Sequence, residues 1–300
     1  MLYSGIVSLP RFAANIRKAM WLCFEHDVLN TAKATAYSGM LMLFPAIVVI
    51  TTVAAIVPEG PSLLGEFRRS FQQFMPSDTI DILQASLQAH RTLSVQLIVY
   101  GGGLTLFAGL GTMLSLMEGF RRAYRLPRTE WGFWQRRLRA LLLVPIVLVP
   151  LALATLALVF GHQIELWMVG TAGRDLRFIV VFFWRMVRWA VAFVTSIAVL
   201  GALYHFGTRR TEYWLRVMPG AITATLIWFP ATLAFGFYVT RIANYSRFYG
   251  SFGAGIATLV WLYIISFSAL FGSELNGIYF RQRWERNTRD HISRVVSSRI

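Results

Sequence analysis

The chain has 300 residues, of which 56% are hydrophobic and only 14% charged, and its mean hydropathy is +0.54. This composition is too apolar for a soluble domain of that length and indicates an integral membrane protein. The net charge of +15 would suit a protein that binds nucleic acid, but most lysines and arginines lie in the segments between apolar runs. That distribution is typical of membrane topology signals, and we therefore expect no nucleic-acid partner.

The N-terminal segment, residues 10–29, carries an apolar side chain at every fourth position from Phe12 to Phe24, with basic residues elsewhere on the wheel. This period predicts an amphipathic helix. Two locations stay open for this helix. It lies either in the membrane interface, beside anionic headgroups, or packed on the ends of the other helices. Cys23 is the only cysteine of the chain, which excludes an intramolecular disulfide.

Six segments are long and apolar enough to cross a bilayer, since about 20 helical residues span its hydrocarbon core. These segments cover residues 35–57, 97–117, 140–160, 189–206, 218–240 and 251–279. The predicted fold class is therefore all-α, a polytopic membrane protein with six transmembrane helices. Its predicted parts are residues 1–34, a cytoplasmic or interfacial amphipathic helix; 35–280, the transmembrane domain; and 281–300, a basic cytoplasmic tail.

The segment between the first two spans, residues 58–96, is the only sizeable extramembrane region. After Pro61 and again after Pro76, apolar residues recur at steps of three and four, which predicts two short amphipathic helices. We expect a small helical external loop here.

The distribution of basic residues predicts the orientation. Lys and Arg outside the spans number 20 on the side of the termini and 7 on the opposite side. Under the positive-inside rule, both termini then lie in the cytoplasm, as in a multi-pass protein of a bacterial inner (plasma) membrane.

Prolines and glycines interrupt several spans. A proline removes one backbone hydrogen bond and kinks its helix, a break that can mark a substrate path or simply be tolerated in a membrane. Glycine lets helix backbones approach closely. The predicted helix-break and packing positions are Pro45, Pro219, Gly220, Gly250, Gly253 and Gly272.

Glu274 is the foremost candidate functional residue, because it is a lone carboxylate near the far end of the last span. Tyr263 shares its helix face, whereas Asn276 lies on another face, suited to hydrogen bonding a neighbouring helix. Two interpretations of Glu274 stay open. It is either a proton- or cation-coupling group or a structural carboxylate paired with an arginine or capped near the cytoplasmic end.

Arg185 and Arg188 lie one turn apart at the expected outer mouth of the fourth span, between Trp184 and Trp189. Their planar donors could hold an anionic lipid headgroup, or the pair could be an interfacial anchor. Tyr37, in the first span, completes the candidate substrate or coupling residues.

Three stretches together resemble the YihY/virulence factor BrkB family. They are TAKATAYSGMLMLFPAIVVI in the first span, MPGAITATLIWFPATLAFGFYV from Met218, and YGSFGAGIATLVWLYIISFSALFGSELN from Tyr249 to Asn276. The resemblance implies a six-helix inner-membrane protein with cytoplasmic termini, linked with envelope function and transport. It also implies that the family's former label, ribonuclease BN, is mistaken.

The motifs of common enzymes are missing from the sequence. None of the five histidines stands in an H-x-H or H-x-x-E-H arrangement, and there is no nucleophile elbow or phosphate-binding loop. We therefore expect no enzyme, no catalytic or metal-binding residue and no cofactor. The expected function is that of a transporter or lipid-handling permease for an amphipathic or anionic envelope molecule, with membrane lipids as partners. The alternative is a non-transporting scaffold that supports envelope assembly.

Overall fold

The computed structural model describes residues 9–56, 95–127, 132–150, 177–208, 213–241 and 252–297, and every regular element in these ranges is helical. The all-α fold class is thereby confirmed. The elements are α1 (Leu9–Glu25), α2 (Val28–Ile56), α5 (Val95–Ala123), a helix over residues 133–150, α7 (Arg177–Phe206), α8 (Trp214–Arg241) and α10 (Phe252–Ser297). The expected helical loop after the first span lies outside the described residues.

Four of these helices are long and apolar enough to cross a membrane: Ile98–Ala123, Phe182–Phe206, Trp214–Val239 and Gly255–Arg289. α2 covers nearly all of the predicted first span, and the helix over residues 133–150 covers the first half of the predicted third span, whose remainder lies outside the described residues.

The boundaries differ from prediction at three places. The amphipathic helix ends already at Glu25, α7 begins twelve residues before the expected Trp189, and α10 continues without a break through most of the predicted tail. At about 1.5 Å per residue, the 46 residues of α10 extend well beyond the hydrocarbon core.

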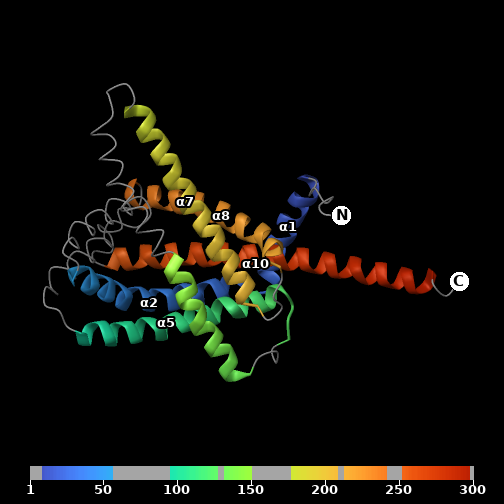
Figure 1. Ribbon diagram of the computed structural model, residues 1–300, viewed down its shortest axis with the longest axis horizontal. Coiled ribbons are helices and arrows are strands. Elements are labelled where there is room, and N and C mark those ends of the chain that lie inside the picture. Colours follow the sequence, from blue (N-terminus) through green and yellow to red (C-terminus); the bar gives the residue numbers. More distant parts are fainter. Residues whose placement is uncertain are drawn as a thin grey trace.

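The last helix lies at the centre of the bundle. α10 packs against α8 on one side and against α2 and α5 on the other, and α7 packs against α8 (Figure 1). The first residues of α1 and the last turns of α10 project from the same end of the bundle, which we call the terminal end (Figure 1). Both described ends of the chain thus lie at one end of the bundle, as an even number of crossings requires.

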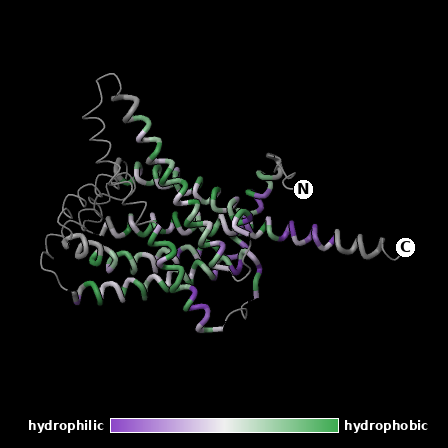
Figure 2. Tube along the Cα trace, viewed as in Figure 1, coloured by the Kyte–Doolittle hydropathy of each residue, from purple (hydrophilic) through white to green (hydrophobic). Residues whose placement is uncertain are grey.

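The terminal end carries most of the hydrophilic residues, on α1, the end of α5, the start of the 133–150 helix and the last turns of α10 (Figure 2). The best-buried side chains also gather toward this end, among them Phe120, Tyr204 and Leu275. Farther along the helices, large apolar side chains such as Phe107 and Phe237 are exposed, in positions that lipid chains would cover in a membrane.

The amphipathic helix α1 combines the two arrangements left open by the sequence. One side packs on the bundle through Ala19, Leu22 and Cys23, which are buried. Its neighbours Met20, Trp21 and Phe24 are exposed, beside the exposed basic residues of the same helix. Part of the expected apolar face therefore points away from the protein, as in a helix that also contacts the membrane interface.

Helices α8 and α10 cross in direct backbone contact at Gly220 and Gly272. A Cβ atom added to Gly220 would collide with the carbonyl oxygen of Gly272, and one added to Gly272 would meet the Gly220 carbonyl and the Tyr204 hydroxyl. Close packing of small residues replaces the hydrophobic driving force, which is missing between helices in lipid.

We predict that Gly220→Ala lowers the free energy of unfolding by about 1–3 kcal/mol, because the added methyl group forces the two backbones apart. The measurement is the thermal unfolding midpoint of purified protein. Gly103→Ala is the matched control, since a Cβ there meets nothing within 4 Å among the described residues. Equal midpoints for the two variants would contradict the prediction.

We predict that a cysteine placed at Asn287 is labelled from the cytoplasm and one at Asp78 from outside, in a Cys23→Ala background. The reason is the 20-to-7 distribution of Lys and Arg. The measurement is labelling of intact cells and of inverted vesicles by an impermeant thiol reagent. Labelling of both positions from the same side would show the topology to be wrong.

Candidate functional site

The candidate site forms around Glu274, whose side chain has no exposed surface within the described part of the chain. Its partner is His26, which comes from the joint between α1 and α2. Nδ1 of His26 lies 2.8 Å from Oε1 and 3.0 Å from Oε2 of Glu274. The imidazole itself is 12% exposed. A buried carboxylate and a titratable base therefore share one hydrogen-bonded site near the terminal end.

The joint that carries His26 is built by its own backbone. The His26 N–H still donates to Leu22 O at 2.8 Å, as the last bond of α1, and Asp27 then adopts a left-handed φ of 59° that ends this helix. Asp27 also opens α2, because its carbonyl accepts from the Thr31 N–H at 3.1 Å and its carboxylate accepts from the Asn30 amide at 2.7 Å. The two helices are thus separated by only two residues.

The end of α5 fixes this joint in place. Arg122 donates to the carbonyl oxygen of His26 at 3.3 Å and lies 3.7 Å from the carboxylate of Asp27. Arg122 in turn belongs to an ion-pair network around Glu118, which also holds Arg121 at 2.6 Å. The two arginines stand three and four residues after Glu118, the spacing at which side chains of one helix meet.

The same network reaches the 133–150 helix. Arg136 donates to Oε2 of Glu118 at 3.0 Å, so a single carboxylate ties two helices together. This third arginine was not predicted, because nothing in the spacing of the sequence places residues 118 and 136 side by side.

Burial controls the proton affinity of the groups around the pair. Burial lowers the pKa of His26 from its ordinary value, and the positive charge of Arg125 lowers it further. Burial also raises the pKa of the neighbouring Cys23 thiol to about 12, with a smaller contribution from the charge of Glu274. Cys23 is therefore protonated and unreactive at neutral pH.

The pair can take up and release a proton without losing its hydrogen bond. When Glu274 is ionised, a protonated Nδ1 donates to it; when Glu274 is protonated, its O–H can donate to Nδ1 of the other tautomer. Proton transfer within the pair thus needs no rearrangement of the helices.

Asn276 has a different partner, as its separate helix face suggested. Its amide donates to Val217 O at 2.9 Å, and its carbonyl oxygen accepts from the Gly220 N–H at 2.9 Å. Both bonds reach the first turns of α8 on either side of Pro219, whose ring has no N–H to donate. A side chain of α10 thereby satisfies backbone groups next to a proline in the neighbouring helix.

The remaining candidate residues do not join the pair. Tyr37 is 62% exposed on α2, and Tyr263 is half-buried and stacks on Phe267 at 6.5 Å between ring centroids. Pro45 lies inside α2 and Gly253 is buried near the start of α10. Gly250 lies outside the described residues.

Arg185 and Arg188 lie within α7. This helix begins at Arg177, before the expected Trp189, and its apolar stretch from Phe182 to Phe206 includes both arginines near its start. The structure describes their backbone and not their side chains, so their proposed roles remain predictions.

His26 is the residue that the sequence did not reveal. The sequence indicates no partner for it, because no histidine or carboxylate stands at the spacing of a metal-binding motif from it. Its partner lies 248 positions away, and only the packing of α1 on α10 brings the two together. A usable signal did exist: His26 precedes the first span and Glu274 lies near the end of the last, so the topology puts both toward the same side of the membrane. Among the described residues no group of three His, Cys, Asp or Glu could hold a metal ion.

We predict that His26→Ala lowers the free energy of unfolding by about 1–3 kcal/mol, because Glu274 loses its donor. The pH dependence should follow from the lowered pKa of His26. Below the ordinary value of 6.5 the unfolded chain binds a proton at His26 before the folded protein does, so stability falls as the pH falls.

His26→Gln separates the two effects, since its amide can still donate but cannot be protonated. The measurement is the thermal midpoint between about pH 8 and about pH 5, the range in which histidine titrates. We expect a smaller decrease toward low pH in His26→Gln than in the wild type. Parallel curves would show that His26 does not contribute.

Comparison with known proteins places the chain in a family. The family model for virulence factor BrkB matches residues 23–295. The ribonuclease-like protein YfkH of Bacillus subtilis is 27% identical over 86% of this chain and 92% of its own length. A UPF0761 membrane protein of Tolumonas auensis is 23% identical over 95% of this chain and 90% of its own length.

Other relatives are longer. The UPF0761 membrane protein Bpet3042 of Bordetella petrii is 23% identical over 88% of this chain, which spans only 57% of that protein. No solved structure matches the chain. The match over most of the sequence confirms the resemblance drawn from the three motifs, and the chain is an integral membrane protein that belongs to the virulence factor BrkB family.

Proposed function

We propose that the protein moves an amphipathic or anionic envelope molecule, such as a lipid, within or across the bacterial inner membrane. In this proposal both termini lie in the cytoplasm, and the Glu274–His26 pair couples the movement to protons. No catalytic reaction is assigned to the protein. The observation that carries the proposal is the hydrogen bond between a fully buried carboxylate and an imidazole inside a membrane bundle.

The choice of residues at this site supports a functional role. Ionisable groups inside a membrane protein are unfavourable and commonly mark ion or proton pathways. A hydrophobic pair of similar volume would hold α10 to the α1–α2 joint equally well or better. Packing alone therefore does not explain an acid and a base at this position.

The position of the pair also suits a moving part. Glu274 has no exposed surface, so its proton reaches water through His26, whose imidazole is 12% exposed. His26 sits on the α1–α2 joint, next to Asp27 with its left-handed backbone. A few residues between two helices can absorb such a change in backbone angles.

The alternative is a membrane scaffold without transport. Complete burial of Glu274 and the backbone contact between Gly220 and Gly272 both favour a solid bundle. In a scaffold, the pair would serve only to hold α1 against α10, and its protonation would not matter for function.

The test uses proteoliposomes with a fluorescent phosphatidylglycerol, whose exchange between leaflets is followed by chemical quenching from outside. We expect protein-dependent exchange that differs between about pH 6 and about pH 8, the range around an imidazole titration. Glu274→Gln is nearly isosteric and cannot ionise, so exchange should lose this pH dependence.

Arg286→Gln is the control, because it also replaces a charged side chain of α10 by an amide, at an exposed position twelve residues beyond Glu274. It should retain the wild-type pH profile. An absence of exchange in vesicles that contain folded wild-type protein would contradict transport of this lipid class and favour the scaffold. An unchanged profile in Glu274→Gln would show that the pair does not couple.

A further inference from the structure

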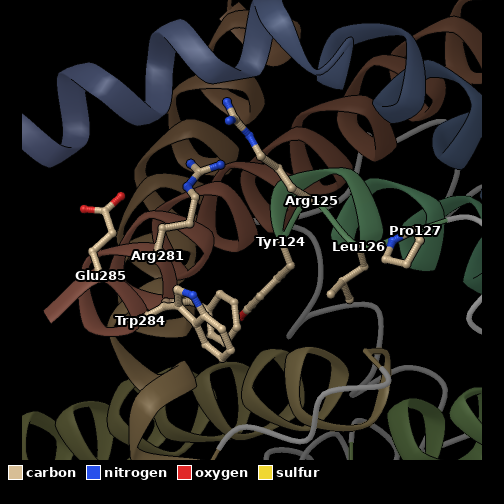
Figure 3. Close-up of a pocket in the computed structure, with 8 residues that line it drawn as sticks. Tyr124, Arg125, Leu126, Pro127, Arg281, Trp284 and Glu285 are labelled. Carbon is tan, nitrogen blue, oxygen red and sulfur yellow. The ribbon is translucent and has the colours of Figure 1, made fainter. Parts of the chain in front are cut away.

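A cavity of about 240 Å³ lies at the terminal end, between the last residues of α5 and the part of α10 beyond Glu274. Two arginines line it, Arg125 from the end of α5 and Arg281 from α10, together with the aromatic residues Tyr124 and Trp284. Figure 3 shows both guanidinium groups on one side of the cavity and the two aromatic rings on the other.

The two terminal nitrogens of Arg281 have no hydrogen-bond partner in the part of the chain that the structure describes. Both atoms, Nη1 and Nη2, are buried there. A buried charged group without a partner is strongly unfavourable, and such groups in native proteins call for a bound ion, water or ligand. The nearest lining carboxylate, Glu285, is exposed and does not bond these nitrogens.

Arg125 reaches the cavity from an uncommon backbone conformation. Its φ is 52°, the left-handed region in which glycine usually ends a helix. Here the turn is held by two backbone bonds, from Arg125 N–H to Arg122 O and from Leu126 N–H to Arg121 O, both 2.9 Å. Glycine would fit this turn with less strain, so an arginine there indicates a use for its side chain.

Two like charges on one small cavity repel each other. Arg125 has one anionic neighbour, Glu25, at 3.5 Å, and both side chains of that pair are more than half exposed. A surface pair of this kind contributes little. The lining carries two positive charges and the one negative charge of Glu285, so one positive charge remains for a bound anion to neutralise.

We propose that this cavity binds the phosphate group of an anionic molecule, with Arg281 and Arg125 as its ligands. Guanidinium groups present paired donors that match the oxygens of a phosphate. This site does not depend on the proposed proton coupling at Glu274, because it is a separate cavity whose lining does not include that residue.

The lining favours a phosphate that is attached to an apolar body. The lining also contains Phe280 and Trp284, and Trp284 is 59% exposed. Tryptophan in such a position is typical of the membrane–water interface. The volume is below the roughly 300–1,000 Å³ of sites that enclose a drug-sized ligand, so it suits a headgroup whose chains remain in the bilayer.

The experiment measures the thermal midpoint of the full-length protein in neutral detergent, with either phosphatidylglycerol or inorganic phosphate as the probe. Phosphatidylcholine serves as the probe without net charge. We expect a concentration-dependent rise with phosphatidylglycerol and a smaller one, if any, with phosphatidylcholine. A rise with inorganic phosphate at similar concentrations would identify a soluble anion, and its absence a lipid headgroup.

Arg281→Gln should weaken binding of the effective probe at least tenfold, and Arg281→Lys should weaken it less, because lysine keeps the charge without the paired donors. Arg286→Gln is the matched control, since this exposed arginine lies on the same helix and its loss changes the net charge equally. It should bind like the wild type.

The midpoint without any probe distinguishes a binding role from a structural one. Removal of an unpaired buried charge should leave Arg281→Gln as stable as the wild type or more stable. The proposal would be overturned if neither probe stabilised the wild type. It would also be overturned if Arg281→Gln bound within about twofold of the wild type, or if Arg286→Gln weakened binding equally.

Discussion

The hydrogen bond between His26 and Glu274 links the two ends of the chain. Without this bond Glu274 would be a buried charge with no donor near it, which is one of the costliest arrangements inside a protein. With it, the α1–α2 joint is held against α10, and Arg122 extends the connection to α5 through the His26 carbonyl oxygen. Four helices, α1, α2, α5 and α10, are thus connected at the terminal end through the hydrogen bonds around one carboxylate.

The opposite side of α10 is organised by close backbone contact rather than by charge. Gly220 and Gly272 let α8 approach α10 until backbone meets backbone, and Asn276 then reaches the polar groups around Pro219. One turn before Gly272, the Tyr204 hydroxyl donates to Ala269 O at 2.6 Å and brings in α7. Since lipid offers no hydrogen bonds, these side chains supply what water would supply in a soluble protein.

Local pattern was sufficient to predict the type and approximate limits of the helices that the structure describes. The length of the apolar runs identified the spans that lie within α5, α8 and α10. The periodicity from Phe12 to Phe24 identified α1. The start of α7 was misplaced because Arg185 and Arg188 interrupt its apolar run, although a helix tolerates them. Asn276 was assigned to a helix contact from its face alone, since the face of a residue follows from the helical repeat.

The partners of the polar residues could not be predicted in the same way. Nothing local relates His26 to Glu274, or Arg136 to Glu118, because each contact depends on how two distant helices pack. The buried state of Arg281 is equally invisible in the sequence, where it appears as one of several arginines in a basic tail. The side of the membrane is the one long-range relation that the sequence does carry, and it places residues before the first span and near the end of the last toward the same side.

The proposed phosphate site and the Glu274–His26 pair lie on one helix and would influence each other. Arg281 follows Glu274 by seven residues, two turns on the same face, or about 10 Å along the axis. Across such a distance two unit charges interact by about 1–2 kcal/mol at the effective dielectric constant of a protein. An anion bound at Arg281 would offset the positive charge that favours ionised Glu274, so the pair would hold its proton more tightly. By reciprocity, protonation of the pair would strengthen anion binding to the same extent. Proton and anion would then bind together, which is the relation that a proton-coupled carrier of anions requires.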